Sequence, residues 1–189
     1  MKRIILAVLG VLTVSAGAEA QSTAQMIEKA LTPAPSVARA RDAITVIKWN
    51  DDHTYETLRE GTNQLVCYDR SGAPGHAAFA VQCTVLGNLE RVAQNRRFEE
   101  EGGDRRGTAA LVNAAVENGT RVPVIFGSVW MASDGDDMAS AHMHTTIAVP
   151  GATMETSGFS ESFRDGGIWI MGAGTDAAHL MIPDQPVEH

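Results

Sequence analysis

The segment from Ala141 to Pro150 constrains the fold more than any other part of this 189-residue chain. A β-strand sends successive side chains to opposite faces of its sheet. The two faces of a strand here are Met143, Thr145, Ile147 and Val149 on one side and His142, His144, Thr146 and Ala148 on the other. We predict that the first face packs on a core and that the second presents two imidazoles to a ligand. Residues 167–173 and 179–183 are expected to form strands packed around this one.

Other short runs of apolar and β-branched residues, bounded by turn residues, predict further strands. They cover residues 43–49, 54–59, 64–68, 168–171 and 178–182. Apolar residues at helical spacing predict helices over residues 86–99 and 104–116. The run 77–85 fits either a strand or a helix, and the apolar run 122–131 precedes an acidic loop at 132–140. This order predicts an α+β fold with a mainly antiparallel sheet and two helices in the middle of the chain, on one side of the sheet.

The N-terminus has the three parts of a secretory signal peptide. Lys2 and Arg3 are followed by an apolar run and by the cleavage-site pattern Ala18-Glu19-Ala20. The apolar run is shorter than the ~20 residues that a membrane-spanning helix needs, which disfavours a retained anchor. We therefore predict a signal peptide at 1–20 and an exported protein, periplasmic or secreted. The rest divides into a partly flexible lead-in at 21–42, a single domain at 43–183 and a loose tail at 184–189.

The charge balance limits the classes of partner. The chain carries a net charge of −8, and Lys29 and Lys48 are its only lysines after residue 20. Such a surface is unsuited to nucleic acid or to an anionic membrane. No stretch after the signal peptide is long and apolar enough to span a bilayer. The expected partner is therefore a small ligand or another protein.

The chain has two cysteines, Cys67 and Cys83. In an oxidising compartment an even number of cysteines indicates a disulfide. This bridge would close a loop of about 15 residues and stabilise the fold by ~3 kcal/mol. The alternative is a redox or metal-binding pair, which the lack of a C-x-x-C motif disfavours.

His142 and His144 form the candidate metal site, because residues i and i+2 of a strand point the same way. His179 is the best third ligand, His76 is the next, and Asp176 could orient a ring from behind. Three protein ligands and one open position would let zinc activate water. Nearby methionines would also suit copper; they are Met143, Met154, Met171 and Met181. The competing interpretation is that the histidines are ordinary sheet residues, since a His-x-His pair alone is not a complete ligand motif.

The order of several motifs resembles a group of small exported bacterial proteins of unknown function. These motifs are Leu58-Arg59-Glu60-Gly61-Thr62-Asn63, the two cysteines, the histidine strand, and the closing Ala173-Gly174-Thr175 followed by Ala178-His179-Leu180-Met181-Ile182-Pro183. The resemblance implies an exported domain and brings no activity with it. One departure is that Leu65 and Val66 precede the first cysteine, where similar chains have an aromatic residue.

Three functions remain open at this point. The leading hypothesis is a non-enzymatic exported domain that binds a small ligand, a metal or a protein partner. The first alternative is a metal-dependent hydrolase that uses His142, His144 and His179. The second is a subunit of a cell-surface assembly. Whether the protein is an enzyme stays undecided by the sequence.

Overall fold

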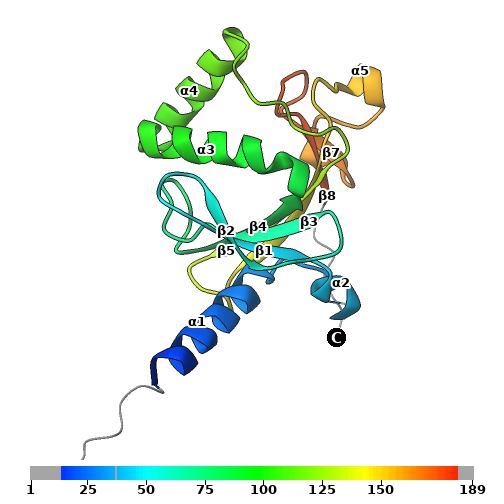
Figure 1. Ribbon diagram of the computed structural model, residues 1–189. Coiled ribbons are helices and arrows are strands. Elements are labelled where there is room, and N and C mark those ends of the chain that lie inside the picture. Colours follow the sequence, from blue (N-terminus) through cyan, green and yellow to red (C-terminus); the bar gives the residue numbers. More distant parts are fainter. Residues whose placement is uncertain (1–13, 37, 183–189) are drawn as a thin grey trace, which may run out of the picture.

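A computed structural model describes residues 14–36 and 38–182 (Figure 1). The N-terminal residues 1–13 of the predicted signal peptide and the predicted tail at 184–189 lie outside the described residues. The helices are α1 (Val14–Ala30), α2 (Ala38–Asp42), α3 (Leu89–Gly102), α4 (Arg105–Glu117) and α5 (Met154–Ser157), with short 3-10 turns η1 (Leu86–Asn88) and η2 (Phe163–Asp165). The strands are β1 (Thr45–Trp49), β2 (Tyr55–Arg59), β3 (Leu65–Asp69), β4 (Phe79–Val85), β5 (Val129–Gly135), β6 (His142–Ala148), β7 (Trp169–Met171) and β8 (His179–Ile182).

The eight strands formed by the described residues belong to one sheet, in the order β2-β1-β3-β4-β5-β6-β8-β7. Every pairing is antiparallel except that of β1 with β3. The predicted α+β fold with a mainly antiparallel sheet is therefore confirmed. The ambiguous run 77–85 is resolved as β4, and the two predicted helices correspond to α3 and α4. Within the described residues, no helix has both the length and the apolar character to cross a membrane.

Helices lie on both sides of the sheet, and not on one side as predicted. Figure 1 shows α1 on the side opposite α3 and α4. The segment predicted as a partly flexible lead-in contributes to the core, because Ala30 and Leu31 are only 2% and 1% exposed. The helix α1 ends at Ala30, and Pro33 and Pro35, which cannot continue a helical backbone ladder, follow it. Ala34 then packs beside them on the sheet.

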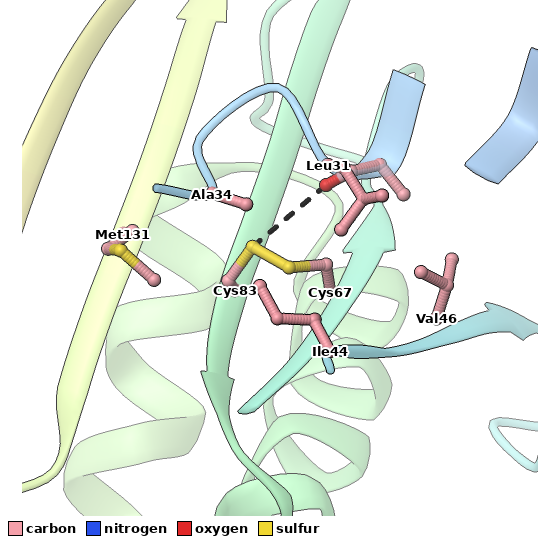
Figure 2. Packing of buried hydrophobic residues seen from close by; sticks show 8 residues of the cluster. Leu31, Ala34, Ile44, Val46, Cys67, Cys83 and Met131 are labelled. Carbon is pink, nitrogen blue, oxygen red and sulfur yellow. Dashed lines mark hydrogen bonds between the residues drawn. A yellow bond between two sulfur atoms is a disulfide. The ribbon is translucent and has the colours of Figure 1, made fainter. Parts of the chain in front are cut away.

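The predicted disulfide is confirmed and lies beneath α1. Cys67 and Cys83 are directly opposite each other on β3 and β4, with their Cα atoms 4.0 Å apart. Figure 2 shows the bridge enclosed by apolar side chains from α1, the loop after it and the neighbouring strands. The Sγ atom of Cys83 lies 3.9 Å from the carbonyl oxygen of Ala30, the contact dashed in the figure. The bridge thus ties together the two strands on which the end of α1 rests.

The opposite face of the same strands forms a second core under α3. It is built from Ile47 and Trp49 of β1, Val66 and Tyr68 of β3, and Leu89 and Val92 of α3. The rings of Tyr55 and Tyr68 each pack in a T-shaped arrangement with the Trp49 ring. This core fixes α3 over the β1–β3 half of the sheet.

The histidine strand is oriented as predicted, but its burial differs from the prediction. Met143, on the expected core face, is 41% exposed, whereas Thr146 and Ala148 on the expected open face are 8% and 4% exposed. The reason is that α1 rests on β2, β3 and β4 and stops short of β6. The layer that contains α3 lies over the other face. Of the strands expected around this one, β8 pairs with β6 directly and β7 forms the sheet edge.

The apolar run 122–131 is mostly not a strand. Residues 122–128 form no helix or strand, and part of their backbone is hydrogen-bonded by side chains of the α3 region. The Val122 carbonyl accepts from Arg91 at 2.6 Å, and the Ile125 amide donates to Asn88 at 3.0 Å. The predicted acidic loop also begins late, because β5 continues to Gly135 and contains Asp134. Pairing of Asp134 with His142 across β5 and β6 explains that extension.

Removing the disulfide tests the importance of the α1 core. A Cys67→Ala/Cys83→Ala variant should lose about 3 kcal/mol of unfolding free energy, because the denatured chain regains the entropy of an open loop. Urea denaturation of the oxidised protein and of the variant measures the difference. Wild type with its disulfide reduced is the control and should match the variant. A loss below about 1 kcal/mol would contradict the role given to this bridge.

Candidate functional site

The sheet face under α3 and α4 gathers most of the polar side chains of interest. Strand register places Tyr68, Gln82, Ala132 and His144 in one row across β3, β4, β5 and β6. Paired residues share a face, so all four side chains point toward the helical layer. The row therefore forms the floor on which the candidate site is built.

Gln82 is the fixed point of this row. Its Oε1 atom accepts hydrogen bonds from the Tyr68 hydroxyl at 2.8 Å and from Arg70 Nη1 at 3.0 Å. Burial raises the pKa of Tyr68 well above its usual range, so the phenol stays protonated and can donate. With the amide oxygen held by two donors, the NH2 group of Gln82 is left free to donate.

Arg70 continues the network to α3 and to the loop that follows β3. Its Nη2 atom donates to Glu99 Oε1 at 2.6 Å and contacts His76 Nε2 at 2.5 Å. Nε2 of His76 also lies 3.4 Å from Glu99 Oε1, so the ring contacts both members of the Arg70–Glu99 pair. Burial raises the pKa of Glu99, but the hydrogen bond to His76 and the charge of Arg70 outweigh it, and the net pKa lies below its usual value. Glu99 is therefore ionised at neutral pH.

A cavity of about 560 Å³ lies on one side of this Arg70–Gln82 bridge. Its floor is formed by β4, β5 and β6, its wall by one face of α4, and one end by the loop after β3. The α4 residues on that wall are Arg105, Thr108, Ala109, Val112 and Asn113. This spacing of three and four residues is one side of a helix. The cavity exists because α4 packs on α3, while the strands beneath α4 carry small side chains such as Ala80 and Ala132.

A smaller cavity of about 250 Å³ lies on the other side of the bridge and shares Arg70 and Gln82 with the first. Arg91 and Arg121 also line it, with side chains only 6% and 9% exposed. Asp176 accepts from Arg91 Nη2 at 3.0 Å and lies 3.6 Å from Arg121 Nε. Burial lowers the pKa of Arg121 to about 10, with the nearby charge of Arg91 acting in the same direction and Asp176 opposing it. Arg121 still carries its charge at neutral pH.

The structure does not bring the three predicted metal ligands together. His144 lines the larger cavity, His179 lines the smaller one, and His142 is exposed at the outer end of β6. His179 is paired with Ala148, four residues along β6 from His144, which corresponds to about 13 Å along the strand. In the ranges 14–36 and 38–182, no group of three His, Cys, Asp or Glu side chains is arranged to hold a metal ion. The predicted zinc or copper site thus gains no geometric support.

The other predicted site residues have different partners from those expected. Asp176 does not orient a histidine but pairs with the two buried arginines. The Nδ1 atom of His179 lies 2.8 Å from the Ala177 carbonyl oxygen and must donate to it. His76, the reserve ligand, belongs to the Arg70 network.

Sequence reasoning missed the arginines and the inward-facing polar stripe of α3. The polar residues Arg91, Gln94, Asn95 and Glu99 recur at helical spacing and face inward. That stripe is visible in the sequence, but the helix was predicted from its apolar positions alone. Arg70 and Arg121 lie in loops, and no spacing pattern in the sequence distinguished them.

The comparisons with known proteins do not identify this arrangement. No protein-family model matches the chain, and no curated protein or solved structure matches it either. Any functional conclusion therefore rests on the geometry of the two cavities.

The Arg70–Glu99 pair predicts a specific pH dependence of stability. The folded pKa of Glu99 is depressed, so its contribution is fully present above the unfolded pKa and is lost as pH falls through the folded value. A Glu99→Gln variant should lose about 2 kcal/mol at pH 7, because a hydrogen-bonded charge is removed. The difference from wild type should shrink below a pH of about 4. Urea denaturation at several pH values measures both effects.

The control is Glu101→Gln, which changes an exposed carboxylate near the end of the same helix. It should be within about 0.5 kcal/mol of wild type at every pH. A Glu99→Gln difference that stays constant down to pH 3 would contradict the proposed cause.

Proposed function

We propose that this protein is a non-enzymatic binding domain for a small polar molecule, held in the larger cavity between α4 and the sheet. The observation that carries the proposal is a cavity of about 560 Å³ with small residues on its floor and fixed polar groups at its edge. Ligand pockets for small molecules typically measure about 300–1,000 Å³. The cavity is within this range.

Three ionisable side chains on the lining support a polar ligand. Arg105 on α4, Asp134 on β5 and His144 on β6 have no hydrogen-bond or ion-pair partner among the described residues. They carry donors and acceptors on opposite walls of the cavity. A molecule with groups of both kinds would satisfy them together.

The side chains on the floor of the larger cavity are held in place before a ligand binds. Gln82, Ala132 and His144 stand on paired strands, and Gln82 is held by two further hydrogen bonds. Side chains on such elements are ordered before the ligand arrives, which lowers the entropy cost of binding.

The hydrolase alternative lacks a comparable observation. A catalytic metal needs three ligands around one position, and the three histidines are divided between two cavities and an exposed strand end. Thr108, the hydroxyl residue on the cavity wall, donates to the Asp104 carbonyl instead of to a base. The surface-assembly alternative has no structural observation that favours it.

A pair of neighbouring alanines on α4 tests the binding site. Ala109 lines the cavity and Ala110 does not, and both are exposed. A panel of amino acids, sugars, nucleosides and organic acids is screened by thermal shift against wild type, Ala109→Phe and Ala110→Phe. Compounds that stabilise wild type should lose their effect in Ala109→Phe, because the ring fills the cavity, and keep it in Ala110→Phe.

The melting temperatures without ligand should agree between the two variants, since both changes are on exposed positions. Ligands that stabilise all three proteins equally would place the binding site elsewhere. A panel without any stabilising compound, together with no co-purifying small molecule in native mass spectra, would remove the support for the proposal.

We also propose that the protein is exported and that the mature chain begins at Gln21. A disulfide between paired strands supports an oxidising compartment. Among the side chains that the structure describes, those of Ile27 and Ala30 in α1 and of Leu31 just after it contact the core, and all three follow the proposed cleavage site.

Cleavage should therefore leave the fold intact. The protein recovered from a periplasmic extract should have the intact mass of residues 21–189 with one disulfide. Its melting temperature should equal that of a chain expressed from Gln21. A recovered mass that includes the first 20 residues would contradict the cleavage site.

A further inference from the structure

The smaller cavity differs from the larger one in the chemistry of its lining. Among the described residues that line it, Arg70, Arg91 and Arg121 are cationic and none is Asp or Glu. This is unusual in a chain with a net charge of −8. The cavity thus concentrates positive charge within a chain that is acidic overall.

The charges beside this cavity do not balance. Arg70 is neutralised by Glu99, but Arg91 and Arg121 share the single carboxylate of Asp176. Their remaining partners are neutral: the oxygens of Val122, Gln94 and Asn95, and the Phe98 ring, whose centroid lies 5.7 Å from Arg121 Cζ. Arg121 Nε is buried without a hydrogen-bond acceptor among the described residues. A buried excess of one positive charge is unfavourable unless an anion approaches it.

The amides on the lining are oriented as donors. Asn95 Oδ1 accepts from Arg121 Nη2 at 2.6 Å, and Gln82 Oε1 accepts from Tyr68 and Arg70. The NH2 groups of both amides have no acceptor among the described residues. Since each amide has its oxygen occupied, what it can offer a ligand in the cavity is N–H donors.

We propose that the smaller cavity is a binding site for an oxyanion, a carboxylate or phosphate group, seated against Arg91 and Arg121 and bound by the amides of Asn95 and Gln82. The inference goes beyond the proposed function, because it concerns a second cavity and does not require the larger one to be occupied. A planar guanidinium binds both kinds of oxyanion with two parallel hydrogen bonds.

The rest of the lining indicates what carries the oxyanion. Trp130, Val124 and Ala178 provide apolar surface beside the arginines. A volume of about 250 Å³ corresponds to roughly eight water molecules. The site therefore fits a small organic acid with an apolar part better than a bare inorganic ion.

Asn95→Asp is the variant that tests this assignment most directly. It keeps the size of the side chain and places a permanent carboxylate next to Arg121, where the anion would supply one. Gln64→Glu is the control, because it makes the same change of charge at an exposed position outside both cavities. Phosphate, acetate and benzoate are titrated at constant ionic strength with chloride, with melting temperature and calorimetry as readouts.

In wild type, at least one oxyanion should raise the melting temperature saturably, by about 3–5 °C at ten times its Kd. Benzoate should bind more tightly than acetate because of the apolar wall. Asn95→Asp should weaken binding about tenfold or more and melt higher than wild type without anion. Gln64→Glu and Ala109→Phe should keep the wild-type anion response, so that this site and the larger cavity succeed or fail separately.

Two results would overturn the inference. One is the absence of any saturable response to the three anions in wild type. The other is an unchanged response in Asn95→Asp. If that variant does not fold, Ala177→Asp with Ala177→Asn as its neutral control makes the same test at an exposed lining position. There the aspartate should abolish the anion response and the asparagine should retain it. Tighter binding of phosphate than benzoate would assign the oxyanion to a phosphate ester, and the reverse would assign it to a carboxylic acid.

Discussion

The hydrogen bonds of Asn88 connect β4, α3 and the segment that leads into β5, on the side of the sheet that carries α3 and α4. Asn88 is fully buried between β4 and α3, and its amide donates to Thr84 Oγ1 at 3.0 Å and Ser128 Oγ at 2.9 Å. Its oxygen accepts from the Ile125 amide. One side chain thus joins the end of β4, the start of α3 and the segment that enters β5. A buried amide with these partners fixes a single arrangement, since leaving any of them unsatisfied would cost about 1–3 kcal/mol.

The position of α3 determines where both cavities lie. Its apolar face is fixed over β1 and β3, while its polar stripe reaches over β4 to Arg70, Arg121 and the segment 122–128. The helix α4 packs on α3 and not on the strands. It therefore covers the sheet beyond β4 but leaves a cavity between itself and the strands. The bridge from Arg70 to Gln82 then divides the space into two. One part offers groups of both charge signs, and the other offers only cations and neutral donors.

The sequence predicted the sheet well because its strands are short, apolar or alternating, and bounded by turns. The disulfide followed from the number of cysteines, and α3 and α4 from helical spacing. Burial along β6 could not be predicted, because the exposure of Met143 and the burial of Thr146 depend on how far α1 and the α3 layer extend across the sheet. Periodicity gives which residues share a face, but not which face is covered.

The candidate site was harder to predict, since its partners are distant in sequence. Arg91 and Asp176 are 85 residues apart, and Arg70 and Glu99 are 29 apart. The histidines attracted attention because they are close in sequence, yet His144 and His179 face different cavities. The residues that combine to form an electrostatic site are the arginines, and each of them has an ordinary surface-residue pattern in the sequence. Their electrostatic effect arises from burial. An excess charge of two guanidinium groups beside one carboxylate costs little free energy in water but much more when the groups are buried under a helix. The most informative property of this chain is therefore the charge balance inside the fold, which the overall acidity of the sequence conceals.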